Sequence, residues 1–272
     1  MMAIRAAAGF VLLLIMFAVI FFAPVWALPI AVSLISASAV YEMLHTTGFI
    51  GQKRIIAYAM IFSVLVPIWV FFGSINELEL AVVFIYVFLL FIECITGTAG
   101  TSFEKVSGAF FASTVLPFFL SSTVRIFCME NGRFLVLIPH LSAFGSDVFA
   151  LLFGLRFGKN KLCPEISPKK TVEGSVAGLV MGPVVLVVFG WIIQRFYGFD
   201  VSYLRLVLYG FSGAFAGQIG DLSMSFVKRQ FNLKDFGNII PGHGGILDRF
   251  DSVLFAAPLT ELLIILLPAI AR

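Results

Sequence analysis

Long, continuously apolar runs separated by short polar stretches dominate this chain. A helix needs roughly 20 mostly apolar residues to cross a bilayer, because lipid offers no partner to backbone N–H and C=O groups. The runs do not alternate between apolar and polar positions, which favours helices over the strands of a barrel. We therefore predict an all-α, polytopic integral membrane protein of about nine transmembrane helices, over residues 6–23, 26–44, 55–73, 78–96, 108–127, 134–154, 174–196, 203–222 and 252–270.

The composition supports this class of protein. Hydrophobic residues make up 60% of the chain and charged residues only 12%, against about a quarter charged in soluble domains. The mean hydropathy is +1.06. The first run also resembles a secretory signal, since Arg5 precedes an apolar core and small residues follow near Ala27. Its length and the eight runs behind it favour a membrane anchor.

The Lys and Arg residues indicate the orientation. With the N-terminus in the cytoplasm, thirteen of them fall on the cytoplasmic side and five on the other side. This bias is what the positive-inside rule predicts. We expect a cytoplasmic N-terminus and, from the compact length and the lack of a targeting extension, a bacterial inner membrane.

The net charge of +3 does not indicate nucleic acid, because the basic residues lie in loops at the membrane face without an aromatic-interleaved patch. Anionic lipid headgroups or a small anionic substrate explain them better. Most of the cytoplasmic basic residues fall in two loops, roughly 155–173 and 223–251. We therefore expect residues 1–133 to form a membrane-embedded scaffold and residues 134–272 to carry the active site.

Three aspartates flank the second loop. Asp221 ends the eighth predicted helix, and Asp248 and Asp251 begin the ninth, three residues apart and so on one helical face. Acidic residues in a first turn often only complement the helix dipole, which remains an alternative for Asp248 and Asp251. Asp221 would lie at the unfavourable end of its helix dipole. Together the three carboxylates predict a site for a hard cation such as Mg²⁺, which is held by carboxylates together with substrate phosphates.

The stretch "PGHGG" lies between these aspartates. Glycines at 242, 244 and 245 allow the backbone to approach a ligand closely, and successive N–H groups in such turns bind anions, although Pro and Gly more often simply mark turns. His243 alone is more typical of a turn than of a catalyst. The flanking cations Lys228, Arg229, Lys234 and Arg249 are also what the positive-inside rule requires. The combination predicts a polyphosphate site.

The segment "SFVKRQFNLKDFGNIIPGHGGILDRFD", residues 225 to 251, resembles the signature of the phosphatidate cytidylyltransferase, or CDP-diacylglycerol synthase, family. Signature positions in this chain are Ser225, Lys228, Arg229, Lys234, Asp235, Pro241, His243, Gly244, Gly245, Asp248, Arg249 and Asp251. The segment 157–174 is similar to a second region of the family, at Ser167, Pro168, Lys169, Lys170, Thr171, Glu173 and Gly174. The resemblance covers the C-terminal half closely and the first half only in hydropathy.

Two positions depart from the family pattern. Met224 replaces the usual Glu before the Lys-Arg pair, and Leu151 stands where a Tyr tends to follow the aspartate of the sixth span. That aspartate, Asp147, lies within an apolar run, where an ionised carboxylate costs on the order of 3 kcal/mol and usually faces a cavity or a partner. We place it at the rim of the same cavity. We expect Glu42, Glu93 and Glu261 to be structural.

The resemblance implies a reaction between CTP and phosphatidic acid that gives CDP-diacylglycerol and pyrophosphate at the cytoplasmic face. It implies Mg²⁺, with a second cation nearby, at Asp221, Asp248 and Asp251. The residues expected to act in catalysis are Asp221, Lys228, Arg229, Asp235, His243, Asp248, Arg249 and Asp251. The residues expected to bind substrate are Asp147, Ser167, Lys169, Lys170, Thr171, Glu173, Ser225, Lys234, Gly242, Gly244 and Gly245. Partners would be the lipid bilayer and, as a further expectation, a second copy in a homodimer.

Other functions remain open from the residues themselves. A CTP-dependent lipid kinase, or a cytidylyltransferase for another lipid phosphate, would use similar groups. A secondary transporter would also carry an intramembrane charge such as Asp147, but transporters usually show repeated halves with interrupted helices. This chain instead concentrates its polar residues in its last half.

Overall fold

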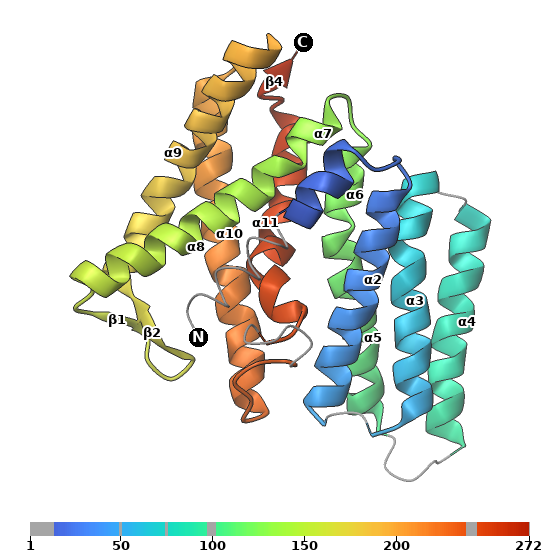
Figure 1. Ribbon diagram of the computed structural model, residues 1–272. Coiled ribbons are helices and arrows are strands. Elements are labelled where there is room, and N and C mark those ends of the chain that lie inside the picture. The colour runs from blue at the N-terminus through green and yellow to red at the C-terminus, as the bar shows by residue number, and fades with distance from the viewer. Residues whose placement is uncertain (1–13, 49–50, 74–75, 97–101, 238–243, 272) are drawn as a thin grey trace. The chain divides into compact units, whose positions relative to one another are not determined.

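The computed structural model describes residues 14–48, 51–73, 76–96, 102–237 and 244–271 (Figure 1). Their contacts divide the chain into two compact units. The first unit joins Met1–Cys128 to Phe231–Arg249, and the second joins Met129–Gln230 to Phe250–Arg272. The described residues of 231–249, which carry part of the family signature, therefore pack with the N-terminal helices. The functional division at residue 133 remains a prediction.

The first unit is a set of helices lying side by side (Figure 1). Its elements are a helical stretch over 14–21, α2 (Ala27–Tyr41), the π-helical turn η1 (Glu42–Thr46), α3 (Lys53–Phe72), α4 (Asn76–Ile95), α5 (Phe103–Leu120) and α6 (Ser122–Phe127). Helix α3 packs against α2, α4 and α5. Phe62 stacks on Tyr86, and the Tyr86 hydroxyl is 2.6 Å from Ser113 Oγ, which joins three of these helices.

The second unit is built on three helices that pack against one another: α8 (Leu137–Phe157), α9 (Val172–Tyr197) and α10 (Tyr203–Gln230). Its other elements are α7 (Gly132–Leu135), β1 (Lys161–Cys163), β2 (Ser167–Thr171), β3 (Asp200–Val201), β4 (Ile270–Ala271) and α11 (Leu247–Leu266), whose first residues belong to the first unit. Val253, Ala256 and Ala257 of α11 form a buried cluster with Ala143 of α8.

Small residues allow the helices of this unit to approach closely. A Cβ atom on Gly210 of α10 would lie 2.4 Å from Pro183 Cα of α9, and one on Gly182 would lie 2.8 Å from the Gly210 carbonyl oxygen. Gly178 packs in the same way on Ser146 of α8. Close backbone approach through small residues is typical of helix pairs in membranes.

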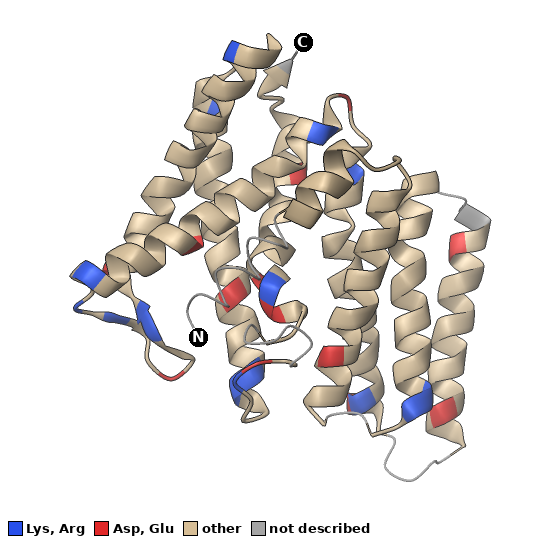
Figure 2. Ribbon diagram, viewed as in Figure 1, with Lys and Arg blue, Asp and Glu red and all other residues tan. Residues whose placement is uncertain are grey.

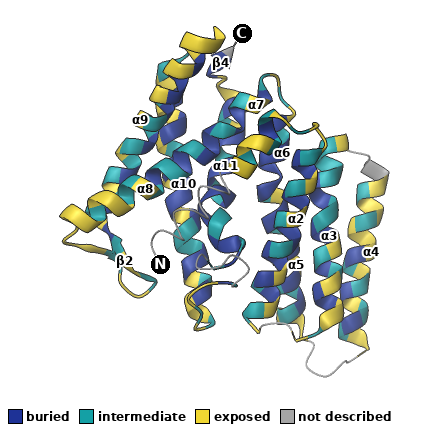
Figure 3. Ribbon diagram, viewed as in Figure 1, coloured by how far each residue is buried: buried dark blue, intermediate teal, exposed yellow. Residues whose placement is uncertain are grey.

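Six of the described helices are long and apolar enough to cross a membrane: Ala27–Thr46, Lys53–Phe72, Leu78–Ile95, Phe103–Phe127, Gly132–Phe157 and Val172–Tyr197. They coincide closely with six of the predicted spans, so the prediction of a helical membrane protein is confirmed. Exposed apolar side chains recur along their outer faces, as on α9 at Val176, Val180, Val184 and Val188 (Figure 3). An exposed apolar stripe of this kind is expected where a helix faces the acyl chains of lipids.

Helix α10 covers the predicted span 203–222 and α11 covers the predicted span 252–270 as far as Leu266, but neither helix is among these six. Glycine and Gln218 dilute the hydropathy of α10, and α11 carries Arg249, Asp251 and Glu261. Residues 6–13 of the predicted span 6–23 lie outside the described residues. The count of nine transmembrane helices and the cytoplasmic location of the N-terminus remain predictions.

Candidate functional site

Asp221 lies at the meeting point of the two polar regions of the second unit. Lys170 of β2 places Nζ 2.5 Å from Asp221 Oδ2. Ser225, one turn further along α10, donates its hydroxyl to Asp221 Oδ1 at 3.3 Å. The prediction that Asp221 ends its helix was wrong, because α10 continues to Gln230. Lys170, rather than the position along the helix, explains why a carboxylate is tolerated here.

Asp251 and Asp147 lie close to this pair. Asp251 is buried, accepts a hydrogen bond from the Ser252 N–H at 2.9 Å, and interacts electrostatically with Asp221, Lys228 and Asp147. The Ser252 hydroxyl donates to Asp147 Oδ2 at 2.8 Å. The partner expected for an intramembrane aspartate is therefore present on a neighbouring helix.

The cluster brings carboxylates and ammonium groups together. Three carboxylates, at Asp147, Asp221 and Asp251, share the region with two ammonium groups, at Lys170 and Lys228. Lys228 is only 7% exposed and Asp251 only 8%, and buried charges are costly unless they are paired. The all-oxygen acceptors of these carboxylates suit a hard cation such as Mg²⁺.

The predicted metal set of Asp221, Asp248 and Asp251 remains a prediction. In the described parts of the chain, no group of three or more His, Cys, Asp or Glu side chains is arranged to hold a metal ion. Asp221 and Asp251 supply two carboxylates, which is the number that Mg²⁺ commonly takes when substrate phosphates and water complete its shell.

A β-hairpin that the sequence did not predict carries Lys169 and Lys170. Strands β1 and β2 pair antiparallel between α8 and α9 (Figure 2 shows their basic positions). The Arg229 Nε–H of α10 donates to the Ile166 carbonyl oxygen at 3.1 Å, which ties the turn of the hairpin to α10. The two regions singled out in the sequence are therefore in direct contact.

Two residues predicted to bind substrate have roles in folding this hairpin. Thr171 Oγ1 accepts a hydrogen bond from the Gly174 N–H at 3.2 Å and so caps the N-terminus of α9. The Glu173 carboxylate accepts hydrogen bonds from the N–H groups of Lys159 and Asn160 and from the Asn160 side chain, at 2.8–3.2 Å. Both residues hold the hairpin against α9, and their contact with substrate remains a prediction.

In the first unit, Asp248 organises the signature segment around itself. Its Oδ2 atom accepts hydrogen bonds from the N–H groups of Phe236, at 2.8 Å, and Gly245, at 2.9 Å. Gly244 has a φ of +85°, and a Cβ atom there would lie 2.9 Å from Asp248 Oδ2. The first glycine of the pair is thus required by this fold of the backbone, since other residues rarely adopt such a φ.

Glu42 contacts the same segment and was not predicted to do so. Its two carboxylate oxygens accept hydrogen bonds from the N–H groups of Ile246 and Leu247, each at 2.8 Å. Glu42 is only 1% exposed. Cβ atoms on Gly237 and Gly245 would lie 2.8 Å and 2.4 Å from its carboxylate oxygens. Its role is therefore more specific than the structural role expected.

The other predicted residues are placed as follows. Lys169, Lys234 and Asp235 are exposed, while Ser167 and Arg249 are half-buried. Arg249 Nε is buried and has no hydrogen-bond partner in the part of the chain that the structure describes. Gly242 and His243 lie outside the described residues.

The sequence analysis missed three polar residues beside the predicted ones. Ser252 directly follows Asp251, and Gln218 lies three residues before Asp221, so proximity in sequence could have suggested both. The Gln218 amide bonds Ser146 and Ser175 and so joins α8, α9 and α10. Glu42 lies about 200 residues from its partners, and only its charge within an apolar run marked it.

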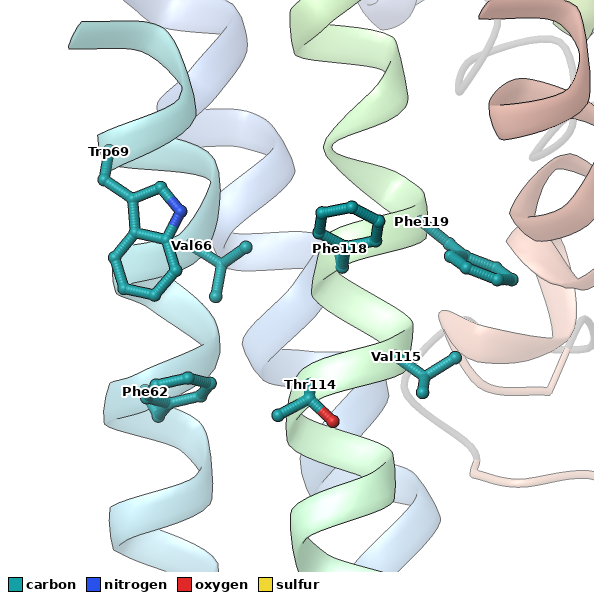
Figure 4. Close-up of a pocket in the computed structure, with 7 residues that line it drawn as sticks. All are labelled: Phe62, Val66, Trp69, Thr114, Val115, Phe118 and Phe119. Atoms are coloured by element: carbon teal, nitrogen blue, oxygen red, sulfur yellow. The ribbon is translucent and has the colours of Figure 1, made fainter. Parts of the chain in front are cut away.

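An apolar cavity of about 290 Å³ lies elsewhere in the first unit, between α3 and α5 (Figure 4). Its lining residues are Phe62, Val66, Trp69, Thr114, Val115, Phe118 and Phe119. None of them is charged or belongs to the predicted site. The cavity therefore lacks the groups that phosphate chemistry needs.

Comparison with known proteins agrees with the sequence signature. A protein named phosphatidate cytidylyltransferase from Staphylococcus saprophyticus is 43% identical over 136 residues, which cover 50% of this chain and 51% of that protein. One of the same name from Bacillus subtilis is 46% identical over 121 residues, 44% of each chain. A third, from Rickettsia bellii, is 36% identical over 149 residues, 53% of this chain and 64% of that protein.

The chain spans about half the length of the curated relatives it matches. The model of the family described as "Cytidylyltransferase family" matches residues 3–267, nearly the whole chain. This protein therefore belongs to the cytidylyltransferase family.

Proposed function

We propose that this protein transfers the CMP moiety of CTP to phosphatidic acid, forming CDP-diacylglycerol and pyrophosphate. The observation that carries the proposal is the ion pair between Lys170 and Asp221. It links Lys170, in the segment 157–174 that resembles the family, to helix α10, whose end carries the first signature positions, beside the buried Asp251 and Lys228. Family membership and the names of the relatives support the same reaction.

In this reaction a phosphate oxygen of the lipid attacks the α-phosphorus of CTP, the bond to the β-phosphate oxygen breaks, and pyrophosphate leaves. No strong base is needed, because a phosphate monoester is already anionic near neutral pH. Transfers of this kind depend mainly on positioning and on neutralising charge over the phosphate oxygens. Lys170 and Lys228 are placed to supply positive charge beside Asp221 and Asp251.

Mg²⁺ fits this donor set and would be held by Asp221 and Asp251, with Asp248 and a second cation as further parts of the proposal. When bound, it supplies charge neutralisation for the phosphates and a template for orienting them. Ser225 orients Asp221, and Ser252 orients Asp147. Lys169, Arg229, Lys234 and Arg249 complete the basic groups available to the triphosphate and the lipid headgroup.

The proposal extends to the membrane. We infer nine spans, a cytoplasmic N-terminus and an active site at the cytoplasmic face, where acyl chains stay in lipid while the headgroup meets aqueous CTP. The count of basic residues on the two sides supports this orientation. A homodimer is part of the proposal and is tested by the mass of the detergent-solubilised protein.

The test is an assay with the purified full chain, phosphatidic acid, Mg²⁺ and CTP labelled at either the α- or the γ-phosphate. We expect α-label in the lipid fraction and γ-label in pyrophosphate. Chelation of divalent cations should abolish product, and added Mg²⁺ should restore it. Lipid that carries the γ-label would instead indicate a kinase. Absence of lipid product, with uptake of substrate into vesicles, would indicate a transporter.

Asp251→Asn tests the assignment of the cluster. We expect a loss of product of at least a hundredfold, because the variant removes a charge that faces Asp221 and Lys228. The matched control is Asp200→Asn, at an exposed position in β3, which should keep activity within about twofold. Full activity of Asp251→Asn would refute the proposed role of that carboxylate.

A further inference from the structure

Helix α11 begins without a capping side chain of its own. The residue before Leu247 is Ile246, whose side chain cannot accept a hydrogen bond from the free N–H groups of the first turn. The Glu42 carboxylate fills this role from another helix, with Oε1 bound to the Ile246 N–H and Oε2 to the Leu247 N–H. A negative group at a helix N-terminus is also favoured by the helix dipole.

The glycines around Glu42 indicate that this contact is built into the fold. Gly245 would place a Cβ atom 2.4 Å from Oε2, and Gly237 would place one 2.8 Å from Oε1. Any other residue at these two positions would displace the carboxylate. The second glycine of the signature pair is therefore explained by Glu42, without any ligand.

The local backbone on the α2 side is specialised as well. Glu42 is the first residue of the π-helical turn Glu42–Thr46, and the Thr46 hydroxyl donates to the Glu42 carbonyl oxygen. Single π-helical turns are rare and occur frequently at functional sites. The carboxylate lies near enough to Asp248 for the two like charges to repel, and Asp248 Oδ2 accepts hydrogen bonds from the N–H groups of Phe236 and Gly245. Two buried carboxylates thus share four backbone N–H groups of one short segment.

We propose that Glu42 is a positioning residue for the signature segment: it fixes the first turn of α11 and thereby the placement of Asp248, Arg249 and, one turn along the same helix, Asp251. The kinetic part of this proposal rests on the proposed cytidylyltransferase function. Displacements of about 1 Å at a reacting centre can reduce rates about a hundredfold. Replacing Glu42 should therefore lower kcat more than it changes KM.

The first test is Glu42→Gln, which keeps one acceptor oxygen but presents an NH₂ group to the second backbone N–H. We expect kcat per folded molecule to fall by about 10- to 100-fold, while KM for CTP changes by less than about threefold. Glu42→Ala should lower kcat per folded molecule further than Glu42→Gln does. The matched control is Glu93→Gln, another buried acid near the end of a helix in the same unit, which interacts with Arg54 and Tyr58. Its kcat per folded molecule should stay within about twofold.

The second test does not depend on activity. Hydrogen–deuterium exchange of the peptide covering 244–249 should be at least tenfold faster in Glu42→Gln than in wild type and unchanged in Glu93→Gln. Unchanged exchange in this peptide would overturn the proposal whatever the enzymatic activity. If wild type makes no CDP-diacylglycerol but exchange responds as expected, the proposed function fails and the positioning role stands.

Gly237→Ala tests the contact from the other side, in wild type and in the Glu42→Ala background. Because its Cβ atom meets the Glu42 carboxylate, it should lower kcat severalfold in wild type and by less than about twofold in the Glu42→Ala background. Equal losses in both backgrounds would show that Gly237 and Glu42 act independently, which contradicts the proposal.

Discussion

At the scale of single residues, the hydrogen bond from Ser252 to Asp147 gives a direct prediction. Ser252→Ala removes a hydroxyl that donates to this carboxylate at 2.8 Å. Hydrogen bonds to charged groups contribute about 1.5–3 kcal/mol. We expect the free energy of unfolding to fall by about that amount and turnover to fall about tenfold, measured by thermal unfolding in detergent and by the labelled-CTP assay.

Thr260→Val is the matched control on the same helix. Thr260 is fully buried, and its hydroxyl has no hydrogen-bond partner in the described residues. Replacing an unsatisfied hydroxyl with a methyl group of similar shape should be neutral or stabilising. Equal losses in Ser252→Ala and Thr260→Val would show that general packing of α11, rather than the bond to Asp147, is responsible.

The sequence identified most of the charged residues at this scale but not their partners. Asp221, Asp251 and Lys228 were predicted to belong to the site because charged residues are rare in this apolar chain. Lys170 was expected to bind substrate, yet it is paired with Asp221. Glu42 was expected to be structural, and the structure shows that its hydrogen-bond partners lie about 200 residues away. Local patterns cannot show which distant backbone groups a carboxylate will satisfy.

At the scale of elements, the β1–β2 hairpin depends on Glu173. This carboxylate accepts hydrogen bonds from the N–H groups of Lys159 and Asn160 at the start of the hairpin. Glu173→Gln should therefore loosen the hairpin that carries Lys170. We expect faster hydrogen exchange over residues 159–171 and a KM for CTP raised severalfold, with a smaller change in kcat.

Glu165→Gln provides the control within the same hairpin, because Glu165 is exposed near the turn between the strands. Glu165→Gln makes the same change of charge but keeps the hydrogen bonds of Glu173 to the start of the hairpin. Its hydrogen exchange over residues 159–171 and its KM for CTP should therefore match those of wild type. If both variants raised KM equally, the net charge of the hairpin rather than its anchoring would explain the result.

The contact between α9 and α10 gives a second prediction at this scale. Gly210→Ala would place a Cβ atom 2.4 Å from Pro183 Cα and 2.6 Å from Pro183 N, and backbone atoms cannot yield as a side chain can. Overpacking of this kind costs about 1–3 kcal/mol. We expect the melting temperature in detergent to fall by several degrees.

Gly51→Ala is the control for this substitution. No atom lies within 4 Å of a Cβ atom built at Gly51, so its melting temperature should stay near that of wild type. A similar fall in melting temperature in both variants would mean that the clash with Pro183 does not explain the loss of stability in Gly210→Ala.

Hydropathy predicted the apolar helices well, but it did not predict how polar segments fold. It ended the eighth helix at residue 222, whereas α10 continues to Gln230 and carries Lys228 and Arg229 on the helix rather than in a loop. It treated 155–173 as a loop, where the structure has a β-hairpin. In such segments backbone hydrogen bonds, rather than burial in lipid, decide the structure.

At the scale of the whole molecule, the signature segment is not confined to one compact unit. Residues 231–249 pack with the N-terminal helices, and α11 continues from them into the second unit. The first half of the chain, which resembles the family only in hydropathy, therefore supplies Glu42 to the part that resembles it most closely. The helices predicted to form a scaffold therefore also contact the backbone of the signature segment.

The orientation in the membrane gives the last prediction. In the proposed orientation, which the count of thirteen Lys and Arg residues against five supports, the basic loops would lie in the cytoplasm together with Lys170 and Lys228. CTP does not cross a bilayer, because it carries several charges. Inside-out vesicles from cells expressing the protein should therefore form CDP-diacylglycerol from added CTP without treatment, whereas right-side-out vesicles should need permeabilisation. The Asp251→Asn variant controls for enzymes of the host membrane. Product in sealed right-side-out vesicles alone would reverse the proposed orientation and place the active site on the outer face.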